Sequence, residues 1–198
     1  MTLNIIIQNA TQTLVDHLEE LTALDQAIGD GDHGLNMKRG AQAIQAKLGE
    51  MDGTGLNASL KTMGKTCVAM IGGSSGPVFG TLLMTLAKEL PENPGAAHLA
   101  VALRSGIQAL TRLGKAEVGQ KTLLDVLDPV QKVLALGGDD MLARVKQCAF
   151  ASAAATADMD ATRGRSSFLG DRAKGHVDPG SRSVALIIVS VCDSLAKL

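Results

Sequence analysis

Hydrophobic residues recur every three or four positions along most of the chain, which is the spacing of one face of an α-helix. The first such pattern runs from Leu3 to Leu21 and the second from Leu35 to Leu48. Because strand-like alternation is nearly absent, we predict an all-α fold of about eight antiparallel helices. The other six helices are predicted between Gly or Pro breaks, over residues 56–71, 78–90, 96–113, 122–136, 139–162 and 181–196.

Two residues of the sixth predicted helix bear on its limits. Thr122 is a candidate N-cap, and Pro129 is expected to bend or divide the helix because proline removes a backbone hydrogen bond. The 198 residues, 45% of them apolar, suffice for one well-packed core, so the whole chain, 1–198, is predicted to be a single domain. If helices alternate in direction, every second connection lies at the same end of the bundle. Those connections carry the unusual residues.

The first of these connections holds three carboxylates, Asp25, Asp30 and Asp32, on a turn broken by glycines. Oxygen ligands suit magnesium, manganese or calcium. An EF-hand is excluded, because Gly34 and Ala41 stand where that calcium loop needs ligands. Asp residues in such turns often only cap helices, but three that converge need a counter-ion. We therefore predict a metal site that serves phosphate chemistry.

Three further connections are rich in glycine. Residues 72–80 place glycines and two serines ahead of a helix, where backbone N–H groups can surround an anion, although a close helix–helix turn would use the same residues. Residues 114–122 offer further backbone donors. Residues 164–180 form a loop of a length that is usually functional or disordered, and Phe168 argues against disorder. Phe168 could pack on the bundle or stack on a base.

Charge, hydropathy and cysteine content exclude some classes of function. With 19 basic and 20 acidic residues the net charge is −1, so no basic field favours nucleic acid. No apolar run approaches the length of a membrane span, and we expect a cytoplasmic protein that binds neither nucleic acid nor membrane. Cys67, Cys148 and Cys192 are predicted to be buried reduced thiols. His17 and His98 are predicted to have surface or structural roles.

Several motifs together carry a resemblance to a known family: Gly29-Asp30-Gly31-Asp32-His33-Gly34 with Asn36-Met37, Ser74-Ser75-Gly76, Lys121-Thr122 with Asp125, Gly164-Arg165, Gly175-His176 and Asp178-Pro179-Gly180. In this combination the chain resembles, over essentially its whole length, the L subunits of dihydroxyacetone kinase, the ADP-binding members of the phosphotransferase-linked enzyme. The resemblance implies an eight-helix antiparallel barrel whose loops at one end hold ADP or ATP and two magnesium ions.

The resemblance also assigns site residues by position. Asp25, Asp30 and Asp32 match the metal-ligating aspartates, which act in catalysis through the metal. The positions that match nucleotide contacts are His33, Gly34, Leu35, Asn36, Ser74, Ser75, Gly114, Leu123, Arg165, Asp178, Pro179 and Gly180. The sequence departs from the family's common residues at three positions, which affect contact detail and leave the metal motif intact: Gln120 in place of Asp, Leu123 in place of Met and Phe168 in place of Tyr.

The implied reaction is phosphoryl transfer, in which a protein mainly aligns groups and neutralises charge. By resemblance, a phosphohistidine on a partner M subunit phosphorylates bound ADP, and the phosphoryl group then passes to dihydroxyacetone on a K subunit. Alternatives are the L module of an ATP-dependent kinase for another triose or tetrose, and a fatty-acid kinase module, which is disfavoured because its extra domains are missing. A nucleotide-loaded protein that regulates a transcription factor is a further alternative. His33 could also be a covalent phosphocarrier, although its place beside metal ligands favours a phosphate contact.

Overall fold

The computed structural model describes residues 2–197 and, over that range, contains helices and no strand. The predicted all-α class is confirmed. Two 3₁₀ helices, η1 (Thr156–Asp158) and η2 (Arg165–Ala173), lie between the last two α-helices. The α-helices in chain order are α1 Thr2–Asp16, α2 Leu18–Ile28, α3 His33–Gln45, α4 Leu48–Met51, α5 Leu56–Met70, α6 Ser75–Glu89, α7 Ala96–Gly114, α8 Leu124–Leu136, α9 Met141–Ala155 and α10 Pro179–Leu195.

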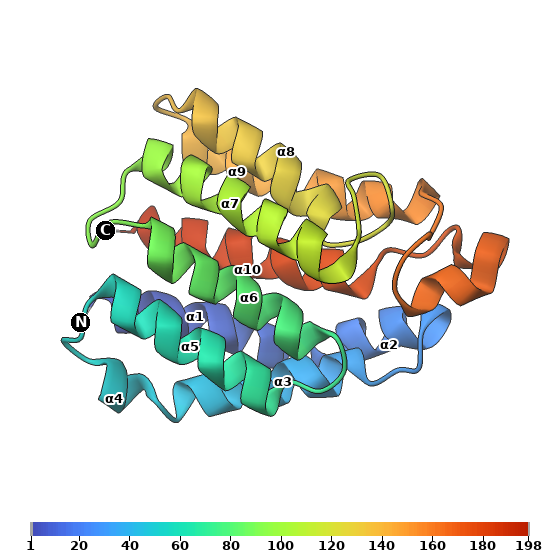
Figure 1. Cartoon of the computed structure of the whole chain (residues 1–198), viewed down its shortest axis with the longest axis horizontal. Coiled ribbons are helices and arrows are strands. Elements are labelled where there is room, and N and C mark those ends of the chain that lie inside the picture. The colour runs from blue at the N-terminus through green and yellow to red at the C-terminus, as the bar shows by residue number, and fades with distance from the viewer. Residues whose placement is uncertain (1, 198) are drawn as a thin grey trace.

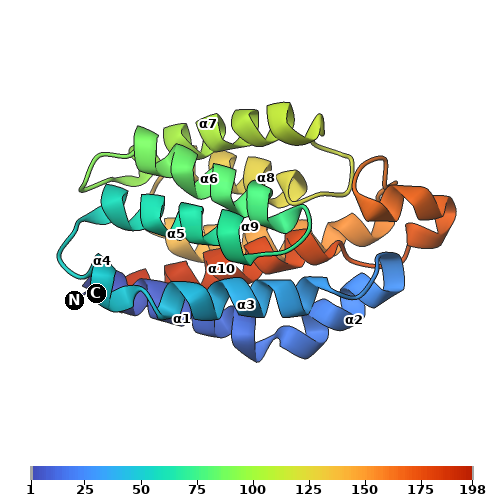
Figure 2. The same ribbon diagram turned by 60° about the horizontal axis from the view of Figure 1, so that its bottom comes forward.

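Eight of the α-helices described over residues 2–197 form a closed ring. Helix α1 packs between α3 and α10, α3 packs on α5, and from α5 to α10 each helix contacts the next. Neighbouring helices along the ring run antiparallel, as Figures 1 and 2 show. The remaining two, α2 and α4, are additions to this barrel: α2 extends beyond the end of α1, and α4 is a single turn between α3 and α5.

Aliphatic and methionine side chains fill the barrel, as expected of a chain with 2% aromatic residues. Phe79 is the one phenylalanine that belongs to the buried cluster of the described residues. Helices α5 and α6 approach closely because two glycines face each other. A Cβ on Gly64 would lie 3.1 Å from the carbonyl oxygen of Gly80, and a Cβ on Gly80 would lie 2.9 Å from that of Gly64. Larger residues at either position would push the two helices apart.

The helix limits differ from the prediction at the first helix. The predicted helix over 3–21 is two helices, α1 and α2, which meet at His17 (φ −100°, ψ 19°). No glycine or proline marks this break. The ring Nδ1 of His17 donates to the carbonyl oxygen of Thr13 at 2.7 Å, so this histidine has the structural role expected. The packing of α2 on α3, α10 and η2 accounts for the change of direction.

Three other limits also differ. Helix α8 continues through Pro129 without division, and its N-cap position is Leu123. The hydroxyl of Thr122 still accepts a hydrogen bond from the backbone N–H of Leu124 at 3.3 Å. The seventh helix, predicted over 139–162, corresponds to α9, which ends at Ala155 and is followed by η1. The predicted loop over 164–180 contains η2.

The cysteines of the described residues are all unpaired. Cys67 and Cys192 are buried as predicted, and burial raises the pKa of the Cys67 thiol to about 12 and that of Cys192 to about 11. Cys148 is only half-buried, which corrects the prediction at that position. Within residues 2–197, no helix combines the length and the apolar character that crossing a bilayer requires.

The alternation of helices brings four connections to one end of the barrel. These are α2–α3, α5–α6, α7–α8 and the long α9–α10 segment that contains η1 and η2 (Figure 2). The start of α1 and the end of α10 lie at the opposite end, beside α4. The rim that the sequence predicts is therefore formed, and it carries the site described next.

Candidate functional site

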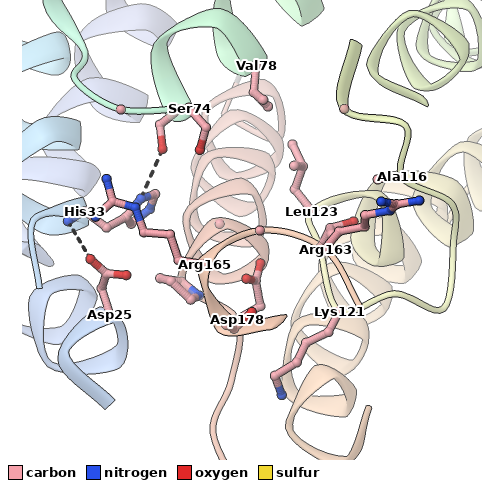
Figure 3. A pocket seen from close by; sticks show the side chains of 18 of the residues that line it. Asp25, His33, Ser74, Val78, Ala116, Lys121, Leu123, Arg163, Arg165 and Asp178 are labelled. Atoms are coloured by element: carbon pink, nitrogen blue, oxygen red, sulfur yellow. Dashed lines mark hydrogen bonds between the residues drawn. The ribbon is translucent and has the colours of Figure 1, made fainter. Parts of the chain in front are cut away.

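A cleft of about 330 Å³ lies between the four connections (Figure 3). Pockets that bind small molecules in proteins start at roughly this size. The cleft brings together most of the residues proposed from the sequence: Asp25, Asp30, Asp32, His33, Ser74, Ser75, Gly114, Leu123, Arg165, Asp178, Pro179 and Gly180.

The three aspartates form a cluster. Asp25, Asp30 and Asp32 each offer a carboxylate oxygen, and these oxygens lie within 4.8 Å of one another. Asp25 is buried on α2, and its Oδ2 accepts a hydrogen bond from the backbone N–H of His33 at 3.0 Å. Asp30 and Asp32 follow in the turn and are more open to the cleft. An oxygen-only set of this kind fits a hard divalent cation such as magnesium.

Glycine makes the turn of the cluster possible. A Cβ on Gly29 would overlap Oδ1 of Asp25, at a separation that real contacts do not reach. Gly31 has φ +78°, a backbone conformation that other residues rarely adopt. The glycines therefore allow the chain to fold tightly against a carboxylate that the metal would need.

We predict that Gly29→Ala weakens divalent-metal binding, because the added methyl group must displace the Asp25 carboxylate. Disturbing what orients a metal ligand typically costs about 10- to 100-fold in metal affinity. Titration with Mn²⁺, followed by electron paramagnetic resonance, measures the change. Gly49→Ala is the matched control, because a Cβ at Gly49 would meet no atom within 4 Å. Equal Mn²⁺ affinity in the two variants would contradict the assignment of Asp25.

Arg165, the first residue of η2, reaches the aspartate cluster. Its guanidinium forms an ion pair with Asp30, and its Nη2 lies 4.0 Å from Oδ2 of Asp32. Figure 3 draws this side chain with His33 among the residues that line the cleft. A guanidinium in this place offsets the mutual repulsion of the carboxylates and can contact an anion brought to them.

His33 joins three segments of the rim. Its Nε2 donates to the hydroxyl of Ser183 at 2.7 Å, because that hydroxyl itself donates to the carbonyl oxygen of Pro179 at 3.0 Å. Its Nδ1 then accepts from the hydroxyl of Ser75 at 3.3 Å. The side chain is 8% exposed, and burial lowers its pKa although Asp25 and other neighbours raise it. Both ring nitrogens are engaged in hydrogen bonds, so neither is free to take up a phosphoryl group in this arrangement.

Three residues proposed from the sequence do not line the cleft: Gly34, Leu35 and Asn36. Gly34 packs against α2, where a Cβ would overlap the carbonyl oxygen of Leu18. Leu35 is 53% exposed on the outer side of α3. Asn36 is buried, and its Oδ1 lies 2.6 Å from the Cβ position of Gly72. Their assignment as nucleotide contacts stays a prediction.

Residues 178–181 themselves determine where α10 begins. Asp178 is the N-cap, and its Oδ2 accepts from the backbone N–H of Ser181 at 2.6 Å and from the Ser181 hydroxyl at 2.9 Å. Pro179 then occupies the first turn, where its missing N–H costs nothing. Burial raises the pKa of Asp178 to about 6, and the hydrogen bonds from Ser181 oppose this rise.

The opposite wall of the cleft is mainly apolar. It consists of Val78, Phe79, Leu110, Ala116, Leu123 and Leu124, which come from α6, α7, α8 and the α7–α8 connection. Two basic residues that are not predicted from the sequence as site residues, Arg163 and Lys121, also line the cleft. The only signal for Arg163 is its place beside a long loop. Phe168 is 89% exposed and lies away from the lining, so it neither packs on the barrel nor faces the cleft.

The chain is similar to proteins of a known family. The sequence profile of the DAK2 domain matches residues 27–193. The chain belongs to the DAK2-domain family. It is 40% identical to the ADP-binding subunit of PEP-dependent dihydroxyacetone kinase 1 of Listeria innocua, over 84% of this chain and 82% of the relative. It is 36% identical to the ADP-binding subunit of the PEP-dependent dihydroxyacetone kinase of Escherichia coli, over 86% of this chain and 85% of the relative.

The DAK2 fold is also seen in a solved structure, that of the dihydroxyacetone kinase from C. freundii in complex with AMP-PNP and Mg²⁺. The TM-score is 0.76 at 26% sequence identity, and the match covers 96% of this chain and 33% of that one. This DAK2 chain thus spans about a third of the solved kinase. The likeness supports the helical architecture described above.

Proposed function

We propose that this chain is the cytoplasmic ADP-binding subunit of a PEP-dependent dihydroxyacetone kinase, and that its cleft holds ADP or ATP with two magnesium ions. One observation carries the proposal. In a DAK2 chain, an aspartate cluster, a Gly-Ser loop at a helix N-terminus and an apolar wall face the same cleft. The relatives that match over more than four fifths of both chains are named as such subunits.

Different groups in the cleft suit different parts of the nucleotide. Asp25, Asp30 and Asp32 supply the oxygen ligands for magnesium. When bound, the ions would offset the negative charge of the phosphates and of the group in transfer. The start of α6, with Ser74 and Ser75, presents backbone N–H groups and hydroxyls that favour phosphate. The apolar wall suits the base.

The chemistry of the cleft also indicates which partner subunits the reaction requires. Every group described above suits a nucleotide, and none forms a separate pocket for a sugar on the same rim. We therefore propose that a K subunit holds dihydroxyacetone and that a phosphohistidine on an M subunit supplies the phosphoryl group. Both would approach the side of the cleft where the Asp30 and Arg165 side chains are half-exposed.

The isolated chain is expected to show negligible phosphorylation of dihydroxyacetone with ATP, and activity should appear when K and M subunits and the upstream phosphorelay are added. Formation of dihydroxyacetone phosphate, coupled to NADH oxidation by glycerol-3-phosphate dehydrogenase, measures this. Reactions that omit one partner at a time are the controls. Robust turnover by the isolated chain would contradict the proposed dependence on K and M subunits.

A further inference from the structure

Lys121 is a buried cation for which the proposed reaction has no direct use. It lies in the α7–α8 connection, is 1% exposed and has φ 60°. Its ammonium donates to the carbonyl oxygens of Thr156, of His176 at 2.6 Å and of Ala157 at 3.3 Å. An ammonium has three N–H groups and accepts none, so these three acceptors match its full capacity.

The direction of the side chain separates it from a phosphate-binding lysine. In Figure 3 it runs away from Leu123 and the cleft, toward the ribbon beneath Asp178. Lys121 is thus part of the lining, but its ammonium is engaged by the backbone behind it. Burial lowers the pKa of Lys121, and the charge of Asp178 raises it. Removing an ammonium from water is unfavourable, and only well-placed acceptors offset that effect.

The three carbonyls belong to the two segments that shape one side of the cleft. Thr156 and Ala157 lie in η1, directly after α9, and His176 lies just ahead of α10. Lys121 itself comes just before α8, on the other side of the cleft. Its ammonium therefore fastens both segments to the beginning of α8.

Other hydrogen bonds join the same two segments to each other. The backbone N–H of Gly175 donates to the carbonyl oxygen of Ala157 at 2.9 Å, and the backbone N–H of Asp178 donates to the Thr156 hydroxyl at 3.0 Å. The first bond fixes the start of the stretch ahead of α10, and the second fixes its end. These bonds hold the stretch to η1, and the hydrogen bonds of Lys121 join both segments to the residues just before α8.

We propose that Lys121 is a positioning residue of the nucleotide site: its ammonium holds the Asp178-Pro179-Gly180 turn at the distance from Leu123 that the nucleotide requires. The role rests on the proposed function, because both sides of the cleft that Lys121 joins are nucleotide-binding only if that function holds. The left-handed backbone of Lys121 agrees with it. Such conformations persist in residues other than glycine where the surroundings fix them, and they gather at functional sites.

The test compares two variants that lose stability for different reasons. Lys121→Met keeps most of the stem and removes the ammonium. Val145→Ala removes two methyl groups from the buried core in the first half of α9, and Val145 is not among the residues that line the cleft. ADP affinity in the presence of Mg²⁺ is measured by calorimetry, well below the unfolding temperature of each variant. Lys121→Met should bind ADP at least about tenfold more weakly than wild type, by analogy with residues that orient ligands, and Val145→Ala should bind it as wild type does.

Each outcome decides a different claim. If Lys121→Met lowers the unfolding temperature but binds ADP as tightly as Val145→Ala, Lys121 is structural only and the inference is wrong. If Lys121→Met does not fold, Lys121→Gln, which keeps a neutral N–H donor, is judged by the same comparison. If the wild-type protein itself fails to bind ADP with Mg²⁺, the proposed function is wrong, and the inference fails with it.

Discussion

Asp30→Ala is expected to abolish the tight retention of ADP, whereas the wild-type protein should keep ADP and divalent metal through purification. Asp30 supplies one of the three carboxylates of the cluster and is the most direct partner of Arg165. Because phosphates would be held largely through the ions, the loss of a ligand weakens metal and nucleotide together. The variant would also remove the ion pair with Arg165, which is half-exposed and contributes little to stability.

Chromatography of the denatured protein gives the amount of ADP per chain, and elemental analysis gives the magnesium. Asp139→Ala is the control, because Asp139 is an exposed aspartate in the α8–α9 connection at the other end of the barrel. The unfolding temperature of both variants shows whether the fold is kept. Undiminished ADP in Asp30→Ala would rule out the metal assignment.

Local patterns predict the architecture because the barrel is built from neighbours in the chain. Each long amphipathic segment packs on the next, so hydrophobic spacing and Gly or Pro breaks locate most helices within a few residues. The division at His17 cannot be predicted in this way. The periodicity continues from Leu14 through Leu21, and the change of direction depends on the surfaces that α2 meets in the folded barrel.

The same distinction between contacts that are local in sequence and contacts that are distant applies to the site. The aspartate cluster is visible from the sequence because its members lie within eight residues of one another, at the end of α2 and in the turn that follows it. Lys121 is not assigned to the site from the sequence, because its burial depends on carbonyl groups that lie 35 to 55 residues further along the chain. The ion pair between Arg165 and Asp30 joins the first connection to the fourth in the same manner. Leu35 shows the converse: a position taken from family resemblance points outward in the structure.

These contacts give the rim a definite construction. His33 joins the first two connections to α10, Arg165 joins the fourth to the first, and Lys121 joins the third to the fourth. The cleft is thus bordered by segments that depend on one another, while Asp30 and Arg165 in its lining stay half-exposed. A site that holds its nucleotide tightly and still admits a second protein needs both properties.

The last prediction concerns the phosphoryl donor. We expect the phosphorylated M subunit to convert ADP to ATP while the nucleotide stays bound to this chain. A histidine that carries the phosphoryl group must approach the bound ADP in line, and the half-exposed Asp30 and Arg165 side chains leave one side of the cleft accessible for such an approach. Chelation of the divalent metal should abolish the transfer, because repulsion between the incoming phosphoryl group and ADP would no longer be offset.

The experiment loads the chain with radiolabelled ADP, removes free nucleotide, and adds phosphorylated M subunit. Labelled ATP should then be recovered with this chain after rapid gel filtration and acid release. Unphosphorylated M subunit and a sample treated with chelator are the controls, and neither should yield ATP. If label appears in ATP only after exchange with added free nucleotide, the donor is not a phosphohistidine protein. The chain is then the nucleotide module of an ATP-dependent kinase, since the same aspartate cluster and cleft would serve ATP taken from solution.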